Sequence, residues 1–268
     1  MEFDVLLPIV IFFIVTLSIY VYRKFAGKLA LLFEDTKIST REAVLMVISM
    51  GIMVTILALM PSQAIQIGFL AIYSYMMFSF TYIALKKWYL AVVTPGAFIL
   101  LYFYYWTLLV FNIFVIFFAL IITVYLSNLF SWKTTLLYTI LLTAMDIFQV
   151  LVTGYMGQYA TKVIELKLPV LLMMPTFPTK GLIGLGLGDV FLAGLLSVQT
   201  ASRLGPKSGI LTAATIGVAM FVFEAALYTT MFARFFPATV IVVAGWIFGI
   251  MIIGLAQPRQ KSQAKETQ

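Results

Sequence analysis

Two aspartates stand inside otherwise apolar stretches of this chain. Asp146 follows the apolar run 141–145, and Asp189 closes the glycine-rich run 184–188. A charged side chain at the centre of a bilayer costs roughly 2.5 to 3.5 kcal/mol on insertion scales. A membrane chain that keeps two of them therefore indicates a function for the pair.

The spacing predicts that the two carboxyl groups meet. Asp146 lies about 8 residues before the long connection 155–179 and Asp189 about 9 residues after Lys180, so both are roughly 12 to 14 Å from the same membrane face. Two facing carboxyls share one proton, because like charges repel when both ionise. The ionised member can take a proton from an attacking water while the protonated member polarises a peptide carbonyl, as in aspartic proteases.

Other chemistries are excluded by composition. The chain has no cysteine and no histidine. This removes disulfides, thiolate or imidazole metal sites, cysteine nucleophiles and serine–histidine arrangements. We therefore expect no metal and no cofactor.

The chain is too apolar for a soluble domain. Hydrophobic residues make up 63% of it and charged residues 10%, and the mean hydropathy is +1.09. These values are typical of a polytopic membrane protein. The net charge of +7 comes from Lys and Arg residues between apolar runs, where they meet lipid headgroups, so we expect the bilayer as a partner and no nucleic acid.

The apolar runs predict an all-α membrane protein with nine transmembrane helices. A span needs about 20 apolar residues. On that measure the spans fall near 5–22, 43–60, 64–85, 89–107, 110–128, 134–154, 181–202, 209–231 and 236–256. Residues 1–256 would form one domain and 257–268 a polar, disordered tail; the weakest boundary is a reversal expected near 107–112.

Positive charge predicts the orientation. Of the 17 Lys and Arg residues, 13 fall on one side of a nine-span chain; the other four are Lys162, Lys167, Lys180 and Arg234. The positive-inside rule then places the N-terminus outside and the C-terminus in the cytoplasm of a cell membrane. The acidic start 1–4 and the lack of a cleavage site after the first apolar run predict that this run remains as a span.

Glycines precede the second aspartate. Gly181, Gly184, Gly186 and Gly188 are predicted to lie on one or two helical turns, where a missing side chain lets another backbone approach. For Gly181 and Gly184, ordinary helix packing is at least as good an interpretation. Gly186 and Gly188, directly before an intramembrane acid, are the sharper signal.

Three motifs together resemble the presenilin and signal peptide peptidase family, and the short archaeal members in particular. Gly186-Leu187-Gly188-Asp189 matches the family's Gly-x-Gly-Asp motif, Asp146 stands one span earlier, and Pro237-Ala238-Thr239 is similar to its Pro-Ala-Leu motif. The likeness covers roughly 134–256. It implies a presenilin-like fold and an intramembrane aspartic endopeptidase that cleaves transmembrane segments of membrane proteins or signal peptides.

Two positions depart from the family pattern. Met145 stands where the family usually has tyrosine, and Thr239 where leucine is expected. Neither change removes a carboxylate. The predicted orientation is that of signal peptide peptidase, which implies substrates whose N-terminus lies in the cytoplasm.

The connection before the second aspartate can contact substrate. Hydrolysis requires the substrate helix to unwind, and the segment 168–174 can pair with it as a strand, as the resemblance also implies. The candidate strand residues are Leu168, Val170, Leu171 and Leu172. An interfacial hydrophobic loop is the alternative interpretation.

Other interpretations stay open. Glu224 is a third acid in an apolar run. It can serve as a proton relay or substrate contact, or it can be a packed carboxyl that faces the helix bundle. Gln149 and Tyr155 follow Asp146 near helical spacing and can lie near the site. A proton-coupled secondary transporter or a catalytically silent protein of the same fold would also carry intramembrane acids. The oligomeric state is not predicted.

Overall fold

The computed structural model describes residues 5–32, 36–176, 181–230 and 236–256. The predicted tail 257–268, Lys180 and Arg234 lie outside these residues. The elements in chain order are α1 (Leu6–Leu32), α2 (Thr40–Leu59), α3 (Ser62–Leu85), α4 (Trp88–Tyr104), α5 (Leu108–Leu129), α6 (Trp132–Ile147), the π-helix η1 (Phe148–Thr153), α7 (Tyr155–Glu165), β1 (Leu171–Pro175), β2 (Leu182–Gly186), α8 (Leu187–Leu204), α9 (Pro206–Thr230) and α10 (Ala238–Ala256).

The chain is a predominantly helical, multi-pass membrane protein. In the described ranges, seven helices are long and apolar enough to cross a membrane, namely α1, α2, α3, α5, α6 with η1, α9 and α10. The apolar helix α4 is shorter, and α8 carries more polar residues. Every predicted span thus contains a helix, while the count of nine crossings stays a prediction.

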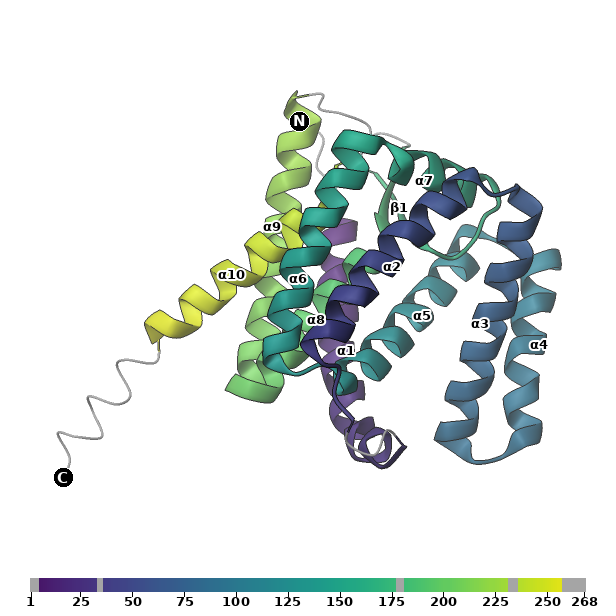
Figure 1. Ribbon diagram of the computed structural model, residues 1–268, viewed down its shortest axis with the longest axis horizontal. Helices are drawn as coiled ribbons and strands as arrows, with labels where there is room; N and C mark the ends of the chain where they lie inside the picture. Colours follow the sequence, from purple (N-terminus) through teal and green to yellow (C-terminus); the bar gives the residue numbers. More distant parts are fainter. Residues whose placement is uncertain (1–4, 33–35, 177–180, 231–235, 257–268) are drawn as a thin grey trace.

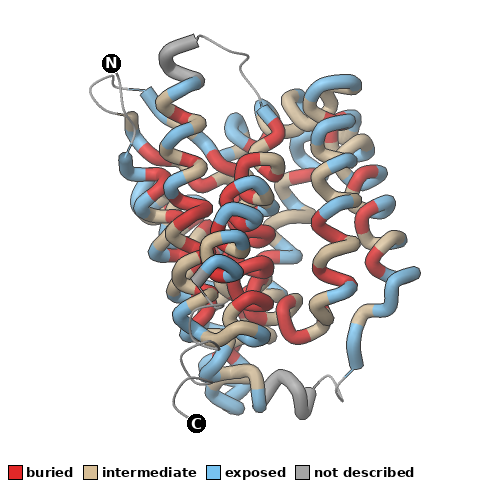
Figure 2. Tube along the Cα trace, turned by 90° about the vertical axis from the view of Figure 1, so that its left-hand side faces the viewer, coloured by how far each residue is buried: buried red, intermediate tan, exposed pale blue. Residues whose placement is uncertain are grey.

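Helix α8 lies inside the bundle. It contacts α1, α5, α9 and α10, and all of its residues from Val190 to Thr200 are buried. Figure 2 shows the buried positions gathered in the interior, with exposed positions on the outer helices. Because protein surrounds α8, it can carry polar residues that a lipid-facing helix could not, such as Gln199, whose Nε2 donates to the carbonyls of Ser127 and Phe130.

Capping side chains set two of the helix starts. Ser131 and Thr134 bond reciprocally to each other's backbone N–H at the start of α6. Thr107 accepts from the N–H of Val110 at the start of α5. Helix α4 ends at Tyr104, so the reversal spans 105–107, which is earlier than most of the predicted stretch 107–112.

The chain between α6 and α8 departs from the prediction. Helix α6 continues as the π-helix η1, ends at Gly154 with φ of 68°, and is followed by α7, a helix that was not predicted within the connection 155–179. The predicted span 181–202 also begins too early, because 182–186 form a strand. Figure 1 shows β1 beside α7, at one end of the bundle.

The two strands form an antiparallel hairpin in the described residues. Leu171 pairs with Gly186 and Pro175 with Leu182. The prediction that Gly184 and Gly186 lie on helical turns is therefore wrong. Glycine is a poor helix former, and the hairpin satisfies the backbone groups that an unwound segment would otherwise leave unpaired at membrane depth.

Candidate active site

Asp146 lies in the last turn of α6, directly before the π-helix. Its Oδ2 accepts a hydrogen bond of 2.7 Å from the hydroxyl of Thr239, a buried residue in the first turn of α10. The side chain of Asp146 is half-buried. Short π-helices occur often at functional sites, because the extra residue locally re-aims the side chains around it.

Asp189 lies in the first turn of α8. The N-terminal end of a helix favours a negative charge, since its N–H groups point toward that end. A Cβ atom on Gly186 would lie 2.9 Å from Oδ2 of Asp189, whereas a Cβ on Gly188 would meet nothing within 4 Å. In the Gly-x-Gly-Asp motif, the first glycine therefore makes room for the acid.

The two aspartates belong to one electrostatic site. The charge of Asp146 acts on the carboxyl of Asp189, and the helices that carry them, α6 and α8, are in contact. Helix α10 contacts both of these helices. Both side chains are half-buried. Carboxyls whose charges act on each other are expected to share a proton, because like charges repel when both ionise.

The third motif reaches the site through its last residue. Pro237 precedes α10 and is buried, and its carbonyl accepts from the N–H of Val240. Ala238 is half-buried at the helix start. Thr239 stood out in the sequence only as a departure from leucine, yet it is the residue that binds Asp146.

The residues around Asp146 fix α6 to α2. A Cβ on Gly51 would lie 2.7 Å from Cε of Met145, so this glycine makes room for the methionine side chain. Gln149 Nε2 donates a 2.7 Å hydrogen bond to the carbonyl of Gly51. Gln149 thus binds the backbone of α2, and Tyr155 begins α7.

The candidate substrate strand falls partly in β1. Leu171 and Leu172 are in the strand, while Leu168 and Val170 precede it and are buried in the core. The carbonyl of Val170 accepts a 2.8 Å hydrogen bond from the N–H of Leu187, which ties this segment to the first residue of α8. The hairpin therefore runs without a break into the helix that carries Asp189.

The outer edge of β1 is already occupied. Asn112 on α5 donates from Nδ2 to the carbonyl of Met173 at 2.6 Å and accepts at Oδ1 from its N–H at 3.0 Å. Asn112 is not among the site residues predicted from the sequence. The available signal was an amide in the long stretch without charge between Trp88 and Trp132, where a polar side chain needs a partner.

The other edge of the hairpin belongs to β2. Backbone groups of alternate residues point to opposite edges of a strand. Since Met173 points to Asn112, its neighbours in β1 point to β2, and their partners there are Leu185 and Ile183. The N–H and C=O groups of Leu182 and Gly184 must then point away from β1.

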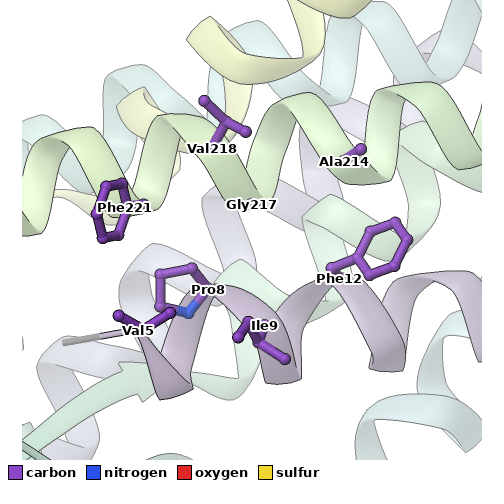
Figure 3. A pocket seen from close by; sticks show the side chains of 8 residues that line it. All are labelled: Val5, Pro8, Ile9, Phe12, Ala214, Gly217, Val218 and Phe221. Carbon is purple, nitrogen blue, oxygen red and sulfur yellow. The ribbon is translucent and has the colours of Figure 1, made fainter.

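Two hollows lie away from the aspartates. One is an apolar groove of about 370 Å³ between α1 and α9, lined by Pro8, Phe12 and Phe221 among others (Figure 3). The other, about 440 Å³ in volume, lies beside Tyr102 and Lys167. Glu224 is buried within α9, on a different helix from either aspartate.

The described residues contain no group of three or more His, Cys, Asp or Glu side chains that could hold a metal ion. The chain matches no protein-family model, and a comparison with curated proteins finds no relative. The case for a function therefore depends on the geometry of the site.

Proposed function

We propose that this protein is an intramembrane aspartic endopeptidase that hydrolyses peptide bonds within transmembrane segments of membrane proteins or signal peptides. The observation that carries the proposal is the placement of Asp146 and Asp189 on two contacting helices, α6 and α8, where the charge of Asp146 acts on the carboxyl of Asp189. A presenilin-like fold of nine spans in the cell membrane, with the N-terminus outside and the C-terminus in the cytoplasm, belongs to the same proposal.

The reaction needs one proton on the pair. The ionised carboxyl removes a proton from a water molecule as the water attacks the scissile carbonyl, and the protonated carboxyl donates to the developing oxyanion. The proton belongs to the pair, so neither aspartate is assigned a fixed role. The hydroxyl of Thr239 donates to Oδ2 of Asp146, which orients this carboxyl.

The edge of β2 that points away from β1 supports a route for the substrate. An unwound substrate segment can add to an exposed strand edge through main-chain hydrogen bonds, whatever its side chains. On β2 this edge is formed by Leu182 and Gly184, and a Cβ on Gly184 would meet nothing within 4 Å. Because β2 leads directly into Asp189, a segment paired there would run past the two carboxyls.

This route moves the proposed substrate contact from β1 to β2. The segment 168–174 was predicted to pair with the substrate, but β1 already pairs with β2 on one edge and meets Asn112 on the other. In the revised proposal, β1 supports the strand that the substrate contacts. Leu168 and Leu172, both fully buried, anchor that support in the core.

The test uses purified protein in detergent or liposomes with a single-span substrate. We expect cleavage by the unsubstituted chain and its loss, by a factor of at least about 10³, in both Asp146→Asn and Asp189→Asn, since an aspartic dyad needs both carboxyls. The matched control is Glu165→Gln, an acid-to-amide change at an exposed position on α7. Cleavage that survives either aspartate substitution, or that never occurs with several substrates, would overturn the proposal.

A further inference from the structure

The chain before Asp189 is held by side chains from the α3–α5 part of the molecule. The hydroxyl of Tyr102 donates to the carbonyl of Leu166 at 2.8 Å, and Nε1 of Trp106 donates to the carbonyl of Lys167 at 2.8 Å. These bonds engage only the backbone of the segment. They therefore fix where the chain lies and are indifferent to its side chains.

Asn112 makes the most specific of these contacts. Both polar atoms of its amide bind the backbone of one residue, Met173, at the centre of β1. A two-point contact of this kind is what a neighbouring strand would provide, so α5 acts as the outer partner of β1. Unlike a strand, it presents a single contact and so holds β1 at one position along its length.

The hairpin needs such a fixed point because its own register is weakly specified. The sequence of β2, Leu-Ile-Gly-Leu-Gly, contributes two glycines with no side chains to pack against β1. Glycine-rich strands are prone to slip. A shift by two residues keeps every side chain on its original face and moves one strand by about 6.6 Å relative to the other.

Such a slip would change the position of the β2 edge relative to the carboxyl of Asp189. Met173 is paired with Gly184, and only four residues separate Gly184 from Asp189 along the chain. Fixing Met173 therefore fixes the edge of β2 relative to the carboxyl. A substrate segment added to that edge would take its own register from it, because the strand pairs are formed residue by residue.

We propose that Asn112 is a positioning residue that sets the register of the β1–β2 hairpin and thereby selects which peptide bond of the substrate meets Asp146 and Asp189. The role in the register of the hairpin concerns the fold alone. The choice of peptide bond rests on the proposed protease function.

The register can be measured without any enzymatic activity. The natural chain has no cysteine, so two cysteines can be introduced in pairs. Met173→Cys with Gly184→Cys joins partners in the observed register, and Leu171→Cys with Gly184→Cys joins residues that face each other only after a two-residue slip. Disulfide formation requires Cα atoms within about 7 Å, so each pair reports one register.

The variant to test is Asn112→Leu, which keeps the shape of the side chain and removes both hydrogen bonds. The matched control is Asn128→Leu, the same change on the same helix at a buried amide whose Nδ2 has no partner among the described residues. We expect the ratio of slipped to native disulfide to rise roughly tenfold or more in Asn112→Leu, and to stay unchanged in the control.

Cleavage products identified by mass spectrometry test whether Asn112 affects the choice of peptide bond. In Asn112→Leu we expect the principal product to be joined by products cut two residues away, with Asn128→Leu giving the original pattern. An unchanged disulfide ratio in Asn112→Leu would overturn the register role. A changed ratio with unchanged cleavage positions would overturn the link to bond selection. Absence of cleavage by the unsubstituted chain would instead count against the protease proposal, and the disulfides would still decide the role of Asn112.

Discussion

The hydroxyl of Thr239 and the carboxyl of Asp146 are joined by a hydrogen bond of 2.7 Å, across 93 positions of the chain. The bond connects the first turn of α10 to the last turn of α6. It gives the Pro-Ala-Thr motif a direct contact with the candidate dyad. Leucine, the residue expected from the family at this position, could not make it.

The Thr239 contact predicts a dependence on the hydroxyl group. Thr239→Val keeps the shape and removes the donor, and we expect kcat to fall about 10- to 100-fold, because hydrogen bonds to charged groups contribute about 1.5 to 3 kcal/mol. Thr239→Ser retains the hydroxyl and should keep most of the activity. A kinetic assay that separates kcat from KM checks this; equal activity in the valine and serine variants would contradict it.

The space beside Asp189 predicts that Gly186 tolerates no side chain. In Gly186→Ala the new Cβ would lie 2.9 Å from Oδ2 of Asp189, so the carboxyl must move. We expect cleavage to fall about 10- to 100-fold, the equivalent of roughly 1 to 3 kcal/mol of overpacking. Gly188→Ala meets no atom within 4 Å and should lose less. A larger loss in Gly188→Ala than in Gly186→Ala would refute the steric account.

The packing of Met145 on Gly51 predicts a compensating pair. Gly51→Leu should displace the side chain of Met145, which would lie within 2.7 Å of even a Cβ atom there, and so disturb the neighbouring Asp146. Adding Met145→Ala should recover activity by opening the space again. The measurement is a double-mutant cycle on cleavage rate, with an expected coupling of about 1 kcal/mol or more between contacting residues. Additive losses would show that the two side chains act independently.

Lys162 is predicted to hold α7 on α2. Its ammonium donates to the carbonyls of Ala58 and Met60, at 2.5 and 3.0 Å, where the C-terminal end of α2 favours a positive charge. Lys162→Met should lower the free energy of unfolding by about 1 to 2 kcal/mol. Thermal unfolding in detergent measures this, with the exposed Lys133→Met as the control. A melting temperature equal to that of the control variant would show that the contact does not stabilise the protein.

Much of the helical framework could be predicted because helices are local structures. The run 110–128 and the helix α5 agree closely, since an apolar segment of that length satisfies its own backbone hydrogen bonds wherever it packs. The reversal at 105–107 was harder to place, because the two aromatic residues there, Tyr105 and Trp106, carry no turn signal. Only Thr107, as a helix cap, marked it.

The secondary structure of the segment 182–186 could not be predicted from its own residues. Its apolar residues and glycines were equally compatible with a loosened helix, and nothing within those five residues decides between the two. The strand forms because β1 supplies a partner, and β1 in turn is held at Met173 by Asn112, which is 61 residues away.

What the sequence by itself determined was the positions of the long apolar helices and the identity of two carboxyls that a membrane protein does not keep without a use. Those follow from residue type and run length, which act over a few neighbouring residues. Only the tertiary structure decided that Thr239 binds Asp146, that Gly186 makes room for Asp189, and that Asn112 contacts β1 at Met173. Each of these depends on which helix faces which, and packing between distant segments leaves no periodic trace in the chain.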